Sequence, residues 1–241
     1  MVERPFLVAK EYWKHAVDRF PELLSNGFIK LDAMKLEDKT TIVESIKDEM
    51  MGANFKESGK AHQKFLSDIG IFEHFQQSLY QLATEHLNYT GTIENQYHIA
   101  RCVSNLNHSE AYRSHFDSHL FTLVIPLEIP AEPRIERSGA LYFLSKARPL
   151  ARNEFENFLG KVYFKKFSGM QGYRRLAKQS GFETYDFADG RPLLFCGSTT
   201  LHGNFPVARD LNCDRLTLLA HFFDPAPAFG VGNLFRFIRA R

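Results

Sequence analysis

The sequence is poor in features that mark several protein classes. It has three cysteines, Cys102, Cys196 and Cys213, and no two of them have the CxxC spacing. This small, odd number argues against a disulfide framework and a cysteine-rich zinc site, and it predicts reduced thiols in a cytoplasmic protein. No stretch approaches the ~20 apolar residues of a membrane span. Residues 1–11 lack the long apolar segment of a secretory signal.

An excess of either charge is also missing. The 30 Lys and Arg residues nearly balance the 28 Asp and Glu residues, which leaves a net charge of +2. Such a balance gives no electrostatic reason to expect a nucleic acid or a membrane as partner. The sequence contains no internal repeat and no low-complexity tract, so repeat architectures are not expected.

The sequence does have enough apolar material for a sizeable core. Apolar residues make up 44% of the 241 positions, and the chain contains 23 Phe. This length suits one domain or two small ones. We expect a single domain over 1–241. The many Phe predict a core or pocket with aromatic walls.

Apolar residues recur at helical spacing in the first part of the chain, residues 1–93. A short strand is expected at 28–31, and the helical part is expected to be scaffold. The predicted helices cover 8–25, 36–51 and 60–88, the last broken near Gly70.

Short apolar runs separated by turn signals follow over 94–225, as in a β-rich domain. The sequence therefore predicts an α+β protein with a mainly β core, followed by a C-terminal tail at 226–241. The predicted strands are 95–104, 119–129, 140–145, 182–188, 191–197 and 215–223.

A helical insertion is predicted between strands at 150–180. It is basic, which leaves two interpretations. A solvated helix face would explain the charge, and a lid that favours an anionic substrate would explain it as well. The basic residues are Lys161, Lys165, Lys166, Arg174, Arg175 and Lys178.

The segment 112–127 carries the strongest chemical signal. It starts with polar residues, among them His115 and Asp117, and runs into a β-branched apolar stretch. On an extended backbone, residues two apart point to the same side. The imidazole and the carboxylate can therefore converge on one metal ion. They are two-thirds of a His-His-carboxylate facial triad, the ligand set of non-haem Fe(II) oxygenases.

His202 is the natural third ligand. An apolar strand ends at Gly197, and a polar turn is expected to deliver His202 next to Gly203, where side chains do not crowd it. Two neutral imidazoles and one carboxylate on one face of a metal would leave positions open for a bidentate keto acid and dioxygen.

Arg215 and Thr217 alternate with leucines on the last predicted strand, so both should face the same way. A guanidinium flanked by a hydroxyl suits a buried carboxylate through charge-assisted hydrogen bonds. A keto acid with two carboxylates would then be held at both ends, by the metal and by Arg215.

The order His115-x-Asp117, His202 and Arg215-x-Thr217 resembles the Fe(II)- and 2-oxoglutarate-dependent dioxygenase superfamily. Its prolyl-4-hydroxylase-like branch also places a tyrosine three residues before the metal histidine, as Tyr112 is here. The resemblance covers about residues 95–225. It implies a double-stranded β-helix (jelly-roll) core with the N-terminal helices packed outside. It also implies Fe(II), 2-oxoglutarate and O2, release of succinate and CO2, and stimulation by ascorbate.

Four more residues are candidates for contacts with substrate or with the ligands. Tyr112 and Arg113 precede the first metal ligand, and His119 falls inside the strand expected at 119–129. His119 is therefore predicted to be a neighbour of the metal rather than a ligand. His221 is in phase with Arg215 and Thr217, so it faces either the pocket or the core.

Three functions fit these residues. The first is a hydroxylase of a small, anionic molecule, and we favour it. It predicts a closed pocket under 150–180. The second is a hydroxylase of a protein or peptide side chain, which would need an open groove. The third is a jelly-roll module that binds metal without turnover. Arg215 argues against the third, because a pure metal binder needs no anchor for a keto acid.

Overall fold

The computed structural model describes most of the chain, and the statements below concern that part alone. It has two antiparallel sheets with helices around them, so the predicted α+β class is confirmed. The described residues are 10–36, 38–57, 59–103, 111–130, 138–151, 154–165, 167–179, 181–209 and 214–225. The predicted tail at 226–241 lies outside them.

The larger sheet has six strands and the smaller one has three. In spatial order the large sheet contains β1 (Phe28–Lys30), β7 (Leu193–Phe195), β4 (Phe121–Glu128), β9 (Arg215–Phe222), β3 (Gln96–Val103) and β2 (Phe55–Glu57). The small sheet contains β6 (Glu183–Tyr185), β5 (Leu141–Leu144) and β8 (Leu201–Asn204). Between Pro126 and Glu128 the register of β4 on β9 shifts by one residue, where proline, which has no N–H to donate, is tolerated.

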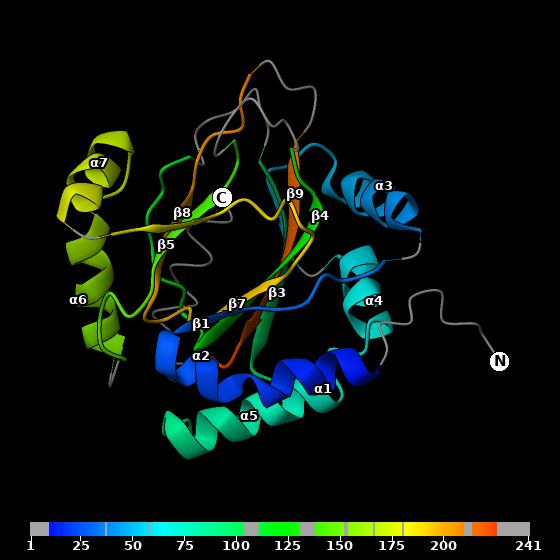
Figure 1. Cartoon of the computed structure of the whole chain (residues 1–241), viewed down its shortest axis with the longest axis horizontal. Helices are drawn as coiled ribbons and strands as arrows, with labels where there is room; N and C mark the ends of the chain where they lie inside the picture. The colour runs from blue at the N-terminus through cyan, green and yellow to red at the C-terminus, as the bar shows by residue number, and fades with distance from the viewer. Residues whose placement is uncertain are drawn as a thin grey trace.

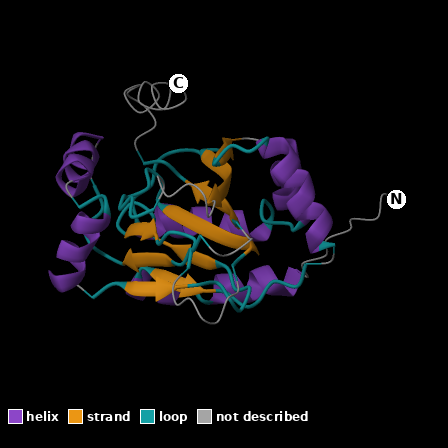
Figure 2. Ribbon diagram, turned by 90° about the horizontal axis from the view of Figure 1, so that it is seen from above, coloured by secondary structure: helices purple, strands orange, loops and turns teal. Residues whose placement is uncertain are grey.

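Helices surround these sheets (Figures 1 and 2). In Figure 1, α1 and α5 lie below, α3 and α4 lie at the right, and α6 and α7 lie at the left beside β5 and β8. The helices are α1 (Lys10–Asp18), α2 (Phe20–Asn26), α3 (Lys39–Met50), α4 (Lys60–Asp68), α5 (His74–His86), α6 (Glu154–Lys165) and α7 (Met170–Gln179). None of the helices in the described ranges combines the length and apolar character that a bilayer span requires.

The helix predicted at 8–25 is two helices in the structure, α1 and α2. Proline lacks an N–H and its ring clashes with the preceding turn. Pro21 therefore occupies the first turn of α2 and the chain breaks at Arg19. The end of α2 is as predicted, with Gly27 in the left-handed conformation at φ 83°. The break predicted near Gly70 is confirmed, since α4 ends at Asp68 and Gly70 has φ 74°.

Two strands were not predicted, β2 and β8. The segment of β8 reads Leu-His-Gly-Asn, and it was predicted to be a turn that delivers His202. It is instead paired with β5, Phe143 opposite His202. Strand propensity depends on the neighbours that a segment meets. A four-residue strand with a glycine is therefore recognisable only through its partner.

Apolar side chains of β9 pack into two separate hydrophobic cores. Leu216, Leu218 and Ala220 point toward the N-terminal helices, in the larger core. Leu219 points the other way, into a cluster between the two sheets that also contains Phe143 and Phe195. All eight residues of β9 are buried, so its polar residues Arg215, Thr217 and His221 are buried as well, on the same face as Leu219. The space between the sheets is where the predicted site residues gather.

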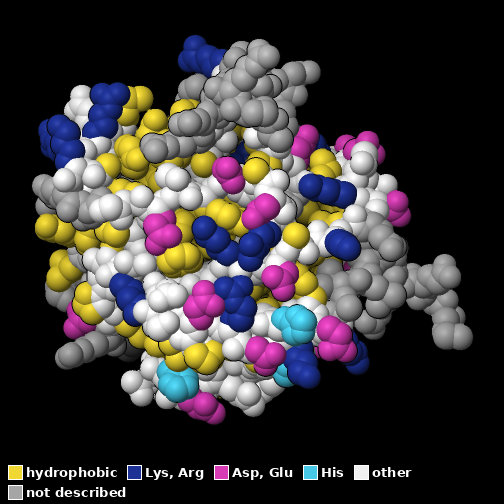
Figure 3. Space-filling model, in the orientation of Figure 1, with side chains coloured by type: hydrophobic (Ala, Val, Ile, Leu, Met, Phe, Trp, Pro, Cys, Tyr) yellow, Lys and Arg dark blue, Asp and Glu magenta, His cyan; other side chains and the backbone are white. Residues whose placement is uncertain are grey.

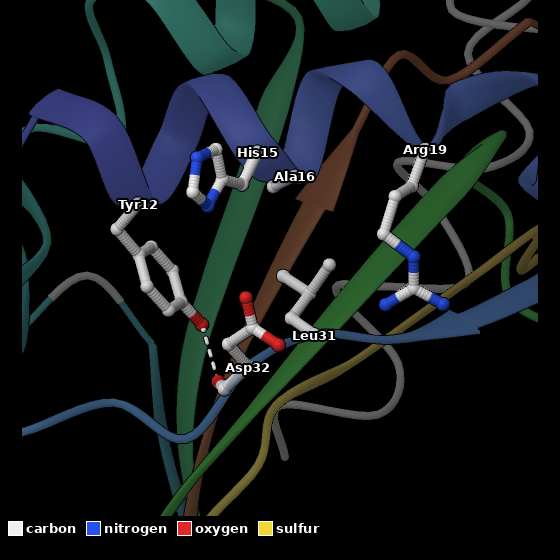
Figure 4. Close-up of a pocket in the computed structure, with 6 residues that line it drawn as sticks. All are labelled: Tyr12, His15, Ala16, Arg19, Leu31 and Asp32. Atoms are coloured by element: carbon white, nitrogen blue, oxygen red, sulfur yellow. Dashed lines mark hydrogen bonds between the residues drawn. The ribbon is translucent and has the colours of Figure 1, made fainter.

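A small hollow separates α1 from the chain that follows β1 (Figure 4). The Tyr12 hydroxyl donates a hydrogen bond to the carbonyl oxygen of Asp32 at 3.0 Å, and burial raises the pKa of Tyr12. The hollow thus lies at the contact between α1 and the segment after β1. It shares no residue with the cluster of predicted site residues described below. Its lining residues are Tyr12, His15, Ala16, Arg19, Leu31 and Asp32.

Phe75 of α5 joins the helices to the large sheet, and its replacement tests this core. It is fully buried and its ring contacts the rings of Trp13, Phe20 and Phe222. We expect Phe75→Ala to lower the free energy of unfolding by about 3–5 kcal/mol, because it leaves a cavity. Urea unfolding measures this. Glu85→Ala on the exposed face of the same helix should change it by less than about 0.5 kcal/mol. Equal effects would contradict the packing described.

Candidate metal centre

His115 and His202 face each other across an isolated antiparallel bridge. The backbone N–H of His115 donates to the carbonyl of His202 at 2.9 Å, and the reverse bond measures 3.0 Å. Residues paired in this way project their side chains to the same side. The two ring centroids are accordingly 4.3 Å apart. Residues 87 positions apart in the sequence thereby become neighbours on one wall of the space between the sheets.

Asp117 completes the group. Its backbone N–H donates to the carbonyl of Gly197 at 3.1 Å. Its Oδ1 lies 3.7 Å from Nε2 of His115, and its Oδ2 lies 3.6 Å from Nε2 of His202. One ligand atom from each residue lies within 4.8 Å of the others. The structure therefore brings the three predicted metal ligands together, and within the described ranges no other His, Cys, Asp or Glu group of this kind occurs.

The outer nitrogens of both histidines are fixed by backbone carbonyls. Nδ1 of His115 lies 2.8 Å from the carbonyl oxygen of Arg113, and Nδ1 of His202 lies 3.1 Å from that of Thr200. A carbonyl can only accept, so each Nδ1 carries the proton. Each Nε2 then directs its lone pair toward the carboxylate of Asp117. This is the arrangement in which protein histidines bind metal ions.

The pKa values favour the protonation states that a metal ion needs. Desolvation by the protein around the ring and the neighbouring imidazole of His202 lower the pKa of His115, although part of the side chain is exposed. Burial alone would raise the pKa of Asp117, but His202, His221, His115 and the Thr122 hydroxyl hold it below its usual range. His115 is therefore neutral and Asp117 ionised at neutral pH, and these forms bind a divalent cation.

Asp117 is supported from behind by residues of β4 and β9. The Thr122 hydroxyl donates to Oδ2 of Asp117 at 2.5 Å and lies 3.0 Å from Nδ1 of His221. The rings of His119 and His221 stack at 5.4 Å, and Tyr97 stacks on both. His119 does not belong to the group formed by His115, Asp117 and His202. It precedes β4, however, and was wrongly expected inside that strand.

Thr122 was missed by sequence reasoning, although a signal existed. It sits opposite His221 in the register of β4 on β9, so the two side chains lie on the same inner face. A hydroxyl residue five positions after Asp117, at the start of an otherwise apolar strand, could have indicated this contact.

Close packing at Gly197 leaves no room for a side chain. A Cβ there would lie 2.5 Å from the Thr122 hydroxyl and 3.0 Å from Cβ and Oδ2 of Asp117. Gly203, beside His202, is similarly tight, because a Cβ would collide with the Tyr142 hydroxyl. Both glycines therefore permit the approach of backbone to the ligand residues.

Arg215 forms a second, cationic part of the site. It is 2% exposed, and its Nη1 donates to Oδ1 of Asn204 at 2.7 Å. Its Nε has no hydrogen-bond partner, and no carboxylate pairs with it, among the described residues. Burial and the charge of Arg101 lower its pKa to about 9, so the guanidinium is charged at neutral pH. Thr217, 1% exposed, lies on the same face of β9.

Asn204 links this cation to the metal group. It lies two residues after His202 on β8, so both side chains point between the sheets, about 6.5 Å apart along the strand. Sequence reasoning missed Asn204, although the spacing His202-x-Asn204 repeats that of His115-x-Asp117. The buried guanidinium of Arg215 is thus bound to a strand position two residues from His202.

Tyr112 and Arg113 have structural contacts. The ring of Tyr112 lies in an aromatic cluster with those of Tyr142, Tyr173 and Phe205. Arg113 is exposed, and its carbonyl orients His115. Contact of either side chain with a substrate stays a prediction.

The insertion packs behind the ligand segment. Phe116 lies between the two ligands in sequence and faces the opposite way, with its ring 4.9 Å from that of Phe164 and the Arg148 guanidinium 4.1 Å above it. Phe164 and Leu176 join the same cluster. These contacts do not support a lid over the metal ligands. The described basic residues of the insertion are exposed, some on α7 at the upper left of Figure 3: Lys165, Arg174, Arg175 and Lys178.

Comparisons with known proteins bear on the fold. The sequence matches no protein-family model, and no curated protein matches it significantly. A prolyl 4-hydroxylase from Phytophthora capsici is similar in structure, with TM-score 0.55, 12% identity, and coverage of 97% of this chain and 75% of that one. So is a prolyl hydroxylase from Trichoplax adhaerens in complex with a hypoxia inducible factor oxygen degradation domain peptide fragment. Its TM-score is 0.54 at 13% identity, with 90% and 94% coverage.

The non-heme alpha ketoglutarate dependent epimerase SnoN from nogalamycin biosynthesis is a third similar structure. Its TM-score is 0.52 at 12% identity, and the match covers 88% of this chain and 84% of that one. The chain has the fold of the prolyl-hydroxylase-like 2-oxoglutarate oxygenases. The resemblance predicted from the motifs is therefore confirmed at the level of fold. In this oxygenase fold, the structure places the three predicted metal ligands within reach of one ion.

The close packing at Gly197 can be tested by metal binding. We expect Gly197→Ala to weaken Mn(II) affinity about 10- to 100-fold, because the added methyl group displaces the Asp117 carboxylate and its Thr122 partner. Calorimetric titration measures the affinity. Gly181→Ala is the matched control, since its Cβ would have no heavy atom within 4 Å. Unchanged affinity in Gly197→Ala would show that Asp117 is not a ligand.

Proposed function

We propose that the protein is an Fe(II)- and 2-oxoglutarate-dependent oxygenase. One observation carries this proposal. The buried guanidinium of Arg215 pairs with no carboxylate among the described residues, and it is hydrogen-bonded to Asn204, two residues along β8 from His202. His202 in turn converges with a second imidazole and a carboxylate. A site for metal alone would not require the cation. The fold is that of enzymes of this class, which supports the proposal independently.

The three converging residues suit iron. His115, Asp117 and His202 supply two nitrogens and one oxygen on one face, and such a set leaves positions open on the other face. His115 is the accessible member, with 42% of its side chain exposed, whereas His202 is 4% exposed. The group would therefore be reached from solvent on the side of His115.

The surroundings of Arg215 suit the far carboxylate of 2-oxoglutarate. A buried donor without a partner is costly, and a carboxylate would accept from Nε and from a terminal nitrogen at once. Asn204 holds one terminal nitrogen at 2.7 Å, and the Phe187 ring lies 5.3 Å from the guanidinium carbon. These contacts fix the plane of the guanidinium. Thr217 lies on the same face and would donate its hydroxyl.

The chemistry follows from this set. When bound, iron and 2-oxoglutarate supply oxidative decarboxylation to succinate and CO2, coupled to oxidation of the primary substrate. The chain's own residues bind and orient them. Thr122 and His221 hold the Asp117 carboxylate, and aromatic residues between the sheets, such as Phe143 and Phe195, exclude water. We infer a jelly-roll core in one domain, and hydroxylation of a small molecule as the outcome.

Iron and 2-oxoglutarate binding give the first test of this proposal. Without oxygen, Fe(II) and 2-oxoglutarate should produce the weak visible metal-to-ligand charge-transfer band, and O2 should then yield succinate. We expect His115→Ala to abolish both, because a ligand is lost. His86→Ala, an exposed histidine at the end of α5, should change neither. If the iron-loaded wild type neither binds nor consumes 2-oxoglutarate, the proposed function is wrong.

A second test concerns the anchor for the keto acid. We expect Arg215→Gln to raise the apparent KM for 2-oxoglutarate about 10- to 100-fold, because a charge-assisted pair is lost. Mn(II) affinity should stay within about twofold, since Arg215 does not contact the metal. Arg215→Lys should recover part of the loss. An unchanged KM would show that another residue holds the carboxylate.

A further inference from the structure

A second arginine faces the same space between the sheets. Arg101 is on β3, directly opposite Thr217 of β9. The alternation along β3 fixes its direction: Tyr97 stacks on His221 of the inner face, and Ile99 packs with the cluster between the sheets. Arg101 continues this series, since residues two apart on a strand share a face.

The position of the Arg101 charge agrees with this direction. Burial is the main cause of the lowered pKa of both His115 and Arg215, and the Arg101 charge lowers each further. Arg101 thus faces the space between the sheets, within electrostatic reach of both groups, rather than the outer surface. Its side chain is partly exposed, as is that of His115. These two residues thus share the solvent-facing side of the site.

The co-substrate does not account for this arginine. Under the proposed function, one end of 2-oxoglutarate binds the metal and the other binds Arg215, Asn204 and Thr217. Both carboxylates then have partners without Arg101. A cation beside the accessible metal ligand lies where the primary substrate must enter.

We propose that Arg101 binds a carboxylate of the primary substrate, and that this substrate is a small organic acid. This inference rests on the proposed function and names its substrate class. A guanidinium pairs with a carboxylate through two parallel hydrogen bonds, so it orients the acid as well as attracting it. The pair would hold the substrate by its carboxylate within the space between the sheets.

The rival location for recognition of an anion is the basic insertion. Arg174, Arg175 and Lys178 are exposed on α7, and α7 packs against the far side of the ligand segment through Leu176. Exposed cations there are screened by water and salt. Arg174 therefore serves as a matched control, because Arg174→Gln removes the same charge from the surface.

The experiment uses the full chain loaded with Mn(II), which is stable in air, and with saturating 2-oxoglutarate. Binding of 2-oxoglutarate is confirmed first by calorimetry. The probes are then acetate, benzoate and N-acetyl-L-proline, each paired with its primary amide. Acetate is small enough to enter any site that admits a substrate. The free acids test whether the substrate is a small acid. The amide of N-acetyl-L-proline tests whether it is a peptide, because the carboxyl group of a proline inside a peptide is part of an amide bond.

We expect at least one acid to bind about tenfold more tightly than its amide. The preference should disappear in Arg101→Gln, be partly kept in Arg101→Lys, and be unchanged in Arg174→Gln. The KM for 2-oxoglutarate and the melting temperature of Arg101→Gln should match the wild type.

Several outcomes would overturn the inference. They are acid binding that is unchanged in Arg101→Gln, amides that bind as well as acids, no binding by any acid, or loss of the preference in Arg174→Gln. A rise in the KM for 2-oxoglutarate in Arg101→Gln as large as in Arg215→Gln would assign Arg101 to the co-substrate instead. Failure of the wild type to bind 2-oxoglutarate in the first step would reject the proposed function itself, which is a separate result.

Discussion

The pair of backbone hydrogen bonds between His115 and His202 is the contact on which the site depends. It joins the segment that leads into β4 of the large sheet to β8 of the small sheet. Because the two residues exchange both bonds, their imidazoles must lie side by side, whatever else the chain does. Asp117 follows two residues later; its backbone is fixed by a bond to Gly197, and its carboxylate accepts a hydrogen bond from the Thr122 hydroxyl.

The space between the sheets is polar at both ends and aromatic in the middle. The carboxylate and imidazoles occupy one end, Arg215 with Asn204 the other, and Phe143, Phe195 and Phe187 lie between them or beside them. The ionised Asp117 makes one end negative and Arg215 makes the other positive. A divalent cation on Asp117 would make both ends positive, and a dicarboxylate would then complement the site better than a neutral ligand of the same length.

Much of the site was predictable because its signals are local. His115 and Asp117 share a face through their spacing of two, and so do Arg215 and Thr217. The contribution of Thr122 and Asn204 depends instead on which strands pair and in what register, and one sequence does not encode that pairing locally. The same reason hid β8, whose Leu-His-Gly-Asn segment resembles a turn until it meets β5. The helix boundaries at Pro21 and Gly70 depend on local signals, because proline and glycine each act on their own backbone. The break near Gly70 was predicted in this way, and the break at Pro21 could have been predicted in the same way but was not.

Phe116 connects the helical insertion to the segment that contains His115 and Asp117. It stands between the two ligands His115 and Asp117 and reaches out of the site into the cluster with Phe164 and Leu176. The extended backbone that turns His115 and Asp117 inward also turns Phe116, which lies between them, outward. The helical insertion therefore packs against the segment 115–117 on the side opposite the site and holds it in place. Looser packing of Phe116 would widen the distribution of distances between His115 and Asp117 without altering either residue, so the geometry of this group depends on the packing of the insertion against Phe116.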